Sequence, residues 1–206
     1  VATSPDGITW TLRTSRNVSW QKIIWVSNLN LFIKIGLSTT TSISTSPDGI
    51  NWTARTTPNV NWYGITYSNT LNLLVAVSNS TTTNKIMTST DGITWTGQTI
   101  NLPISNLYTI LWISELNIFI AAVNSVNTYD RIIISKDGIN WTYRNNDIAF
   151  YYNYTNIAWS SKYNRIILAT SSDKLVYSNI TQENYNYPSI DIKSFDNIYG
   201  YKYIIK

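Results

Sequence analysis

An eight-residue segment, Ser46–Thr53, occurs in four closely similar copies along this chain, and we call it the Asp-Gly marker. The copies are Ser4–Thr11, Ser46–Thr53, Ser89–Thr96 and Ser135–Thr142. Their tryptophans lie 42, 43 and 46 residues apart. A period of this length predicts one supersecondary unit per repeat, with neighbouring units packed side by side.

The first complete unit contains four short segments with β-strand character, separated by turn residues. We predict these strands at Gln21–Val26, Leu31–Leu37, Thr41–Thr45 and Ile50–Arg55. In every unit an aromatic residue is followed five positions later by asparagine, which tolerates the left-handed backbone of a tight turn. These pairs are Trp25 with Asn30, Tyr67 with Asn72, Trp112 with Asn117, and Trp159 with Asn164. We therefore expect a hairpin turn between the first two strands of each unit.

The Asp-Gly marker follows the third segment of each unit. Asp-Gly between two strands favours a hairpin, because glycine accepts positive φ and the carboxylate can accept hydrogen bonds from turn amides. The tryptophan after it offers a large apolar surface for packing between sheets. Four antiparallel strands in about 43 residues are the content of one β-propeller blade. The predicted fold class is thus an all-β propeller of about five blades, or of six or seven if the chain is a fragment.

We divide the predicted single propeller domain, residues 1–206, by the repeat register. The divisions are a blade remnant at 1–14, blades at about 17–57, 59–100, 102–146 and 152–196, and a partial blade strand at 197–206. The last unit lacks the marker: Ser178–Thr181 stand where Ser135–Gly138 stand one unit earlier. If the first and last segments meet, they form one composite blade that closes the ring and protects its sheet edges.

The amino-acid composition excludes several classes of function. The chain has no cysteine and no histidine, so thiol chemistry is excluded and a metal site would have to use carboxylates, carbonyls and hydroxyls, which suit calcium far better than zinc. We expect neither a metal site nor a cofactor. A net charge of +4 without any Lys/Arg run argues against nucleic acid as a partner. No apolar run reaches the roughly 18 residues of a membrane span, so we expect no membrane insertion.

The marker resembles the Asp-box, or BNR repeat, whose usual form is Ser-x-Asp-x-Gly-x-Thr-Trp. The matching residues are Ser4, Asp6, Gly7 and Trp10; Ser46, Asp48, Gly49 and Trp52; Ser89, Asp91, Gly92 and Trp95; and Ser135, Asp137, Gly138 and Trp141. Here glycine follows aspartate directly, one residue earlier than in that pattern. The resemblance implies propeller architecture, with each box a structural turn on the outer edge of a blade. It does not imply one function, because such repeats occur in sialidases, sorting receptors, assembly factors and viral surface proteins.

A sialidase-like site would need an arginine cluster, a tyrosine activated by glutamate, and an acid/base aspartate. Arg13, Arg55 and Arg144 each follow a marker tryptophan by three residues, which favours repeated blade-edge positions. Glu115 and Glu183 are the only glutamates, one in a predicted turn and one in a polar insertion. We therefore predict that the protein is not an enzyme, with a degenerate sialidase-like hydrolase as the third hypothesis.

Tyrosines that break the repeat are the candidate ligand-binding residues: Tyr129, Tyr151 and Tyr152. Flat aromatic faces suit sugars, so a carbohydrate-binding propeller for host attachment is the second hypothesis. By contrast, one column is apolar in every unit, which favours core packing. Its members are Trp20, Trp62, Leu107, Tyr154 and Ile198.

The first hypothesis is a non-catalytic interaction or scaffold module whose partners are other proteins of a larger assembly. The marker repeats and the bias toward asparagine, with 25 residues, resemble structural proteins of large DNA viruses or phages. This resemblance favours a virion or an extracellular surface as the location. Glycans are the alternative partners.

Overall fold

The computed structural model describes residues 1–38, 41–80, 83–100, 102, 106–124, 132–144, 154–171, 175–181 and 189–195. Its regular structure there is β-strand, apart from one short 3-10 turn, η1 (Ser27–Leu29). The strands form four antiparallel sheets of four strands and one sheet of two strands. The predicted all-β class with four-stranded antiparallel units is confirmed.

Each four-stranded sheet is a meander in which consecutive strands pair. The first contains β3 (Ser19–Val26), β4 (Leu31–Leu37), β5 (Ile43–Ser46) and β6 (Thr53–Arg55). The second contains β7 (Trp62–Ser68), β8 (Leu73–Ser78), β9 (Ile86–Ser89) and β10 (Thr96–Gln98). The third contains β11 (Asn106–Ile113), β12 (Ile118–Asn124), β13 (Ile132–Ser135) and β14 (Thr142–Arg144). The fourth contains β15 (Tyr154–Ser160), β16 (Arg165–Thr170), β17 (Leu175–Thr181) and β18 (Ser189–Phe195), and β1 (Ala2–Thr3) pairs with β2 (Thr11–Leu12).

The turns between first and second strands are formed as predicted. Asn30, Asn72, Asn117 and Asn164 all have φ between 48° and 50°, in the left-handed region. Asparagine enters this region more readily than most residues because its short polar side chain bonds the local backbone. The repeated asparagine thus marks the same hairpin in all four sheets.

The fourth strand of each unit begins later than predicted. In the first complete unit β5 ends at Ser46 and β6 begins at Thr53, not at Ile50. The marker is therefore a loop from Pro47 to Trp52 rather than a two-residue hairpin turn. The reason is local: marker side chains bind backbone amides that a tight hairpin would place in the strand ladder.

In the second and third sheets the second strands are covered on both faces, as their apolar runs predict. In the fourth sheet the prediction is wrong, because Ile167 of β16 is 39% exposed where no further described sheet packs on it. In β8, Val75 and Val77 pack in one cluster with Leu107 of the following sheet. Leu74 and Ala76, on the other face, pack in a second cluster with residues of the preceding sheet. The core of the molecule is accordingly a series of layers between neighbouring sheets.

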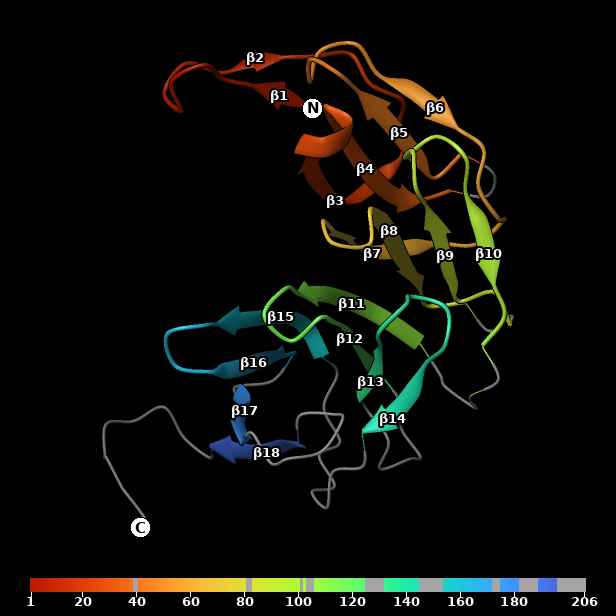
Figure 1. Ribbon diagram of the computed structural model, residues 1–206. Helices are drawn as coiled ribbons and strands as arrows, with labels where there is room; N and C mark the ends of the chain where they lie inside the picture. The colour runs from red at the N-terminus through yellow and green to blue at the C-terminus, as the bar shows by residue number, and fades with distance from the viewer. Residues whose placement is uncertain are drawn as a thin grey trace.

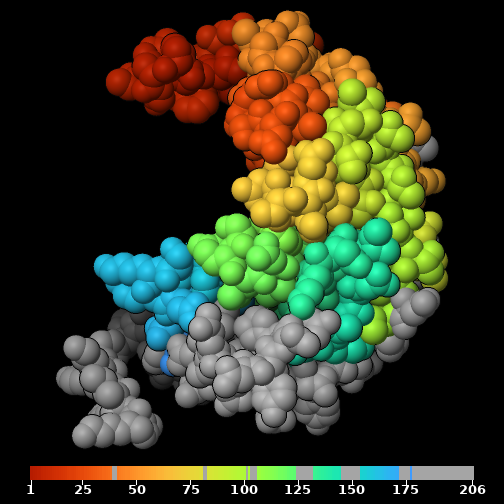
Figure 2. All heavy atoms as spheres, in the orientation of Figure 1, coloured from red at the N-terminus to blue at the C-terminus, as the bar shows by residue number. Residues whose placement is uncertain are grey.

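The four sheets follow one another along a crescent (Figures 1 and 2). Successive first strands, β3, β7, β11 and β15, contact one another along its inner side. The fourth strands β6, β10 and β14 lie on the outer side (Figure 1). This radial order, with one sheet per repeat, is that of propeller blades.

The described strands do not form the composite closing blade that we considered from the sequence. In the described part of the chain β1 pairs with β2 alone, and this small sheet and the β15–β18 sheet lie at opposite tips of the crescent (Figure 1). Closure would need pairing between the two ends of the chain, which a repeat period does not specify. Residues 197–206 lie outside the described residues, so the number of blades in a closed ring stays a prediction.

Candidate functional site

The marker aspartates are bound within their own turns. In the second copy the Asp48 carboxylate accepts hydrogen bonds from the Ser46 hydroxyl and from the backbone amides of Ile50 and Asn51, each at 2.8 Å. The Gly49 amide donates to the Ser46 hydroxyl at 2.9 Å. Equivalent serine–aspartate bonds of 2.8–2.9 Å occur in all four copies. Each carboxylate therefore satisfies turn amides that would otherwise lack a partner.

The marker glycine and tryptophan complete the same turn. Each glycine has φ between 72° and 76°, which strains other residues. Each tryptophan Nε1 donates to the glycine carbonyl at 3.0–3.2 Å. Trp95 and Trp141 are 9% and 7% exposed, whereas Trp10 is 63% exposed because only two strands flank it. The marker thus links a local turn to packing between sheets.

These hydrogen bonds hold the aspartates ionised. Backbone amides of Thr9 and Ile8, with the Ser4 hydroxyl, lower the pKa of Asp6 from 3.8 to about 2. Amides of Asn51 and Ile50 lower the pKa of Asp48 further. A carboxylate with so low a pKa is a poor proton donor or acceptor near neutral pH.

Two of the arginines predicted at blade edges join the third and fourth strands. Arg13 Nε donates to the Thr3 hydroxyl, and Arg55 Nε donates to the Thr45 hydroxyl, both at 2.9 Å. Gln98 makes the equivalent bond to Thr88 at 2.8 Å. These side chains therefore form hydrogen bonds within their own sheets.

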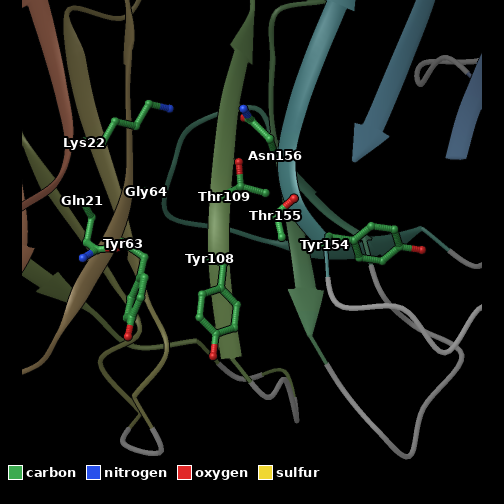
Figure 3. Close-up of a pocket in the computed structure, with 9 residues that line it drawn as sticks. All are labelled: Gln21, Lys22, Tyr63, Gly64, Tyr108, Thr109, Tyr154, Thr155 and Asn156. Carbon is green, nitrogen blue, oxygen red and sulfur yellow. The ribbon is translucent and has the colours of Figure 1, made fainter. Parts of the chain in front are cut away.

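The inner side of the crescent contains a pocket of about 530 Å³ between the first strands of all four sheets (Figure 3). Its volume is in the range of ordinary ligand sites. The residues that line it are Gln21, Lys22, Tyr63, Gly64, Tyr108, Thr109, Tyr154, Thr155 and Asn156. The Asp-Gly markers are not among them, since they connect the third and fourth strands.

A β-bulge shapes each wall of this pocket. The pairing of every first strand with its second strand shifts by one residue, and the extra residues are Gln21, Tyr63, Tyr108 and Thr155. Bulges re-aim side chains and often occur beside functional sites. All four extra residues line the pocket, one from each sheet.

Lys22 makes the pocket cationic. Burial lowers the pKa of its ammonium group below the ordinary value of 10.5. The lining contains no aspartate or glutamate. In Figure 3 the side chains of Lys22, Thr109 and Asn156 extend into the same part of the pocket.

Two tyrosines occupy the other end of the pocket (Figure 3). The rings of Tyr63 and Tyr108 pack edge to face, with centroids 4.9 Å apart and planes at 73°. This contact uses ring surface, so the hydroxyl tips are the main groups offered to a ligand. Tyr154 points away from both, and its side chain is buried.

The predicted ligand-binding residues Tyr129, Tyr151 and Tyr152 lie outside the described residues. Of the apolar column, Trp62, Leu107 and Tyr154 are buried as predicted, Trp20 is partly exposed, and Ile198 lies outside the described residues. The pocket residues were not among the ligand-binding residues that we predicted from the sequence. A signal for them existed: directly after this constant column the units differ, with Gln-Lys, Tyr-Gly, Tyr-Thr and Thr-Asn.

Two kinds of feature are absent from the described residues. No group of three or more Asp or Glu side chains there is arranged to hold a metal ion. None of the helical segments there is long and apolar enough to cross a membrane.

Blades arranged around an inner pocket define this protein as a β-propeller. No protein-family model matches the chain, and no curated protein matches it in sequence. Solved structures match its fold. Virginiamycin B lyase from Staphylococcus aureus aligns with a TM-score of 0.66 and 17% identity, over 91% of this chain and 58% of the lyase chain.

Two other propeller structures are similar. YCF48 from Cyanidioschyzon merolae aligns with a TM-score of 0.58 and 14% identity, over 90% of this chain and 62% of that one. A chain in a crystal structure of a nidogen/laminin complex aligns with a TM-score of 0.56 and 12% identity, over 79% and 60%. This chain spans 58–62% of the length of these three chains. At such identities the similarity shows the propeller fold alone.

Proposed function

We propose that this protein is a non-catalytic propeller module that holds a partner protein of a larger assembly at its inner pocket. The observation that carries this proposal is the pocket itself, to which each of the four sheets contributes a bulge residue. One of the similar structures comes from a nidogen/laminin complex, which pairs two proteins, and it supports a protein as the partner. The marker repeats and asparagine-rich composition favour a particle of a large DNA virus or phage.

A non-catalytic role is supported by how the carboxylates are used. Glycoside hydrolysis generally needs two carboxyl groups facing one substrate. The four marker aspartates are instead spread along the crescent and bound to their own turns. Glu115 lies in the turn between β11 and β12, where it accepts a hydrogen bond from Ser114 at 2.8 Å.

Cross-linking of the intact assembly tests this function. The assembly is isolated through a tag on this chain, treated with a lysine–carboxylate coupling reagent, and mapped by mass spectrometry. We expect cross-links from Lys22 to one co-isolated protein at fixed stoichiometry, and none from Lys22 once Lys22→Met is introduced. Cross-links confined to the outer strands would contradict binding at the pocket, and turnover of a fluorogenic sialoside would overturn the non-catalytic assignment.

A carbohydrate-binding propeller is the second candidate. The observation in its favour is the set of hydroxyl and amide groups in the pocket, from Tyr63, Tyr108, Thr109 and Asn156. Binding to a glycan array that is saturable, competed by free sugar and lost in Tyr63→Ala would support it over the protein-binding module. Tyr151→Ala with Tyr152→Ala is the matching test of the residues predicted from the sequence.

A further inference from the structure

Lys22 is a partly buried cation without a charged neighbour among the residues that the structure describes. It forms no ion pair or hydrogen bond with any other residue that the structure describes. Burial without a counter-ion disfavours the charged form, which is why its pKa is lowered. A bound anion would remove this penalty by pairing with the ammonium group.

A second desolvated lysine, Lys34, differs from Lys22 because the protein supplies partners for its ammonium group. Lys34 is 2% exposed, and its Nζ lies 4.1 Å and 4.0 Å from the ring centres of Trp20 and Trp52. It also donates to the Ser15 hydroxyl. Lys34 is thus supplied with cation–π and hydrogen-bond partners by the protein itself, whereas Lys22 faces the pocket without them.

The position of Lys22 recurs in the other three sheets. Lys22, Gly64, Thr109 and Asn156 each pair immediately after the bulge of their first strand. Asn156 Oδ1 accepts the Ile157 amide at 2.9 Å, so its NH₂ group is left to donate elsewhere. Thr109 adds a hydroxyl, and no carboxylate lines the same space.

Gly64 allows β7 to pack closely against β11 in the wall between Lys22 and Thr109. A Cβ at this position would lie 2.9 Å from Val77 Cγ2 and 3.1 Å from the Tyr108 carbonyl. Contacts this short are not tolerated, so β7 approaches β11 closely only because residue 64 is glycine. This close approach brings the Gly64 backbone and Thr109 into one wall of the pocket.

We propose that the pocket binds a carboxylate side chain of an acidic peptide segment, with Lys22 as its counter-ion and Thr109 and Asn156 as hydrogen-bond donors. This inference rests on the proposed function and names the chemistry of the partner. A peptide is favoured over a sugar because Tyr63 and Tyr108 pack edge to face against each other. Their hydroxyls suit peptide carbonyls, whereas a stacked sugar ring needs a free aromatic face.

Titration of the isotope-labelled chain by NMR tests the proposal with defined probes. The probes are acetyl-Glu-Glu-Glu-amide and its uncharged match acetyl-Gln-Gln-Gln-amide. We expect the glutamate peptide to shift the Gly64, Tyr108 and Thr109 amides in a saturable manner, and the glutamine peptide to bind about tenfold more weakly or not at all. Equal binding of the two peptides would overturn the proposal.

Two lysine variants separate a specific site from general attraction to a chain of charge +4. Lys22→Met should weaken binding of the glutamate peptide by about tenfold, since it removes the counter-ion and retains the side-chain length. Lys162→Met removes an exposed lysine outside the pocket, beside Tyr163, and should leave binding unchanged. Equal losses in both variants would show attraction by net charge and contradict the proposal.

Glucuronic acid, an acidic sugar, is a third probe in the same NMR titration. Binding of glucuronic acid at the pocket without binding of the glutamate peptide would overturn the acidic-peptide assignment and support the carbohydrate candidate. If neither probe binds while Lys22 cross-links to a protein in the assembly, the acidic-peptide inference fails and the proposed function stands. Absence of such cross-links would instead remove the proposed function.

Discussion

Each marker aspartate stabilises the fold through its ionised form. Asp48 accepts two backbone amides and the Ser46 hydroxyl, so protonation would weaken three hydrogen bonds at once. Hydrogen bonds to a charged acceptor are stronger than those to a neutral one. The marker is therefore a set of identical, acid-sensitive turns, and its residues are explained by structure without a ligand.

The first prediction is that the stability of the fold depends on pH through the marker aspartates. The folded-state pKa values of Asp6 and Asp48 lie below the ordinary value of 3.8, with that of Asp6 at about 2. As pH falls, these carboxylates are therefore protonated in the unfolded chain at a higher pH than in the folded chain. The stability that they contribute is fully present above pH 3.8 and is lost as pH falls toward 2. Thermal unfolding followed by circular dichroism should show the melting temperature decreasing across this range.

Asp48→Asn is the matched variant for the pH experiment. It should melt at a lower temperature than the unmodified chain at pH 7, and its melting temperature should change less between pH 4 and pH 2. A decrease of the same size in both proteins would show that the Asp48 carboxylate does not contribute to the acid sensitivity.

At the scale of the element, two backbone features shape every first strand. Its bulge places one residue in the pocket, and its end turns through an asparagine with positive φ. The bulge supplies a residue that lines the pocket, and the asparagine turn sets the register of the hairpin. A register error of one residue would exchange the two faces of the strand and expose the layers of the core.

The second prediction tests the asparagine turn. Asn117 has φ of 50°, and its amide donates to the Ser114 carbonyl at 3.3 Å. Asn117→Ala should lower the free energy of unfolding by about 1–2 kcal/mol, because Cβ disfavours the left-handed region. Asn117→Gly should retain most of the stability, since glycine accepts this φ. Urea denaturation measures both, and equal losses in the two variants would contradict the backbone explanation.

At the scale of the whole molecule, stability comes from layers between sheets, so position along the crescent matters. Trp141 packs in a core cluster with Phe119 and Val75, which belong to two different sheets. The equivalent Trp10 is 63% exposed at the N-terminal tip. A tryptophan in the same turn therefore contributes differently to stability in different blades.

The third prediction compares these two tryptophans. Trp141→Ala should destabilise the protein by about 3–5 kcal/mol, as large-to-small changes in a core do. Trp10→Ala should cost less than about 1 kcal/mol, because little surface is lost from the core. Denaturation followed by circular dichroism measures both changes, and comparable losses would mean that Trp10 is covered in solution.

Much of the fold could be predicted from the sequence because its causes are local. The period of the markers predicted one sheet per repeat, and the repeated asparagine predicted the hairpin that Asn72 and Asn117 form. The start of the fourth strand was predicted too early, at Ile50, because side-chain bonding by Ser46 and Asp48 lengthens the turn. The rules for Asp-Gly turns include bonding by the carboxylate, but they do not specify how many residues the combined bonds of Ser46 and Asp48 enclose.

The sequence by itself determined the blade, since its turns and apolar runs act within about 43 residues. Only the tertiary structure decided the pocket, because Lys22, Tyr63, Tyr108 and Asn156 come from four successive units and converge only when their first strands stack side by side. The order of the described blades along the crescent was also decided by the tertiary structure, because it depends on packing between sheets. Local residue preferences specify each sheet, whereas the angle between sheets and the space they enclose arise from contacts between units.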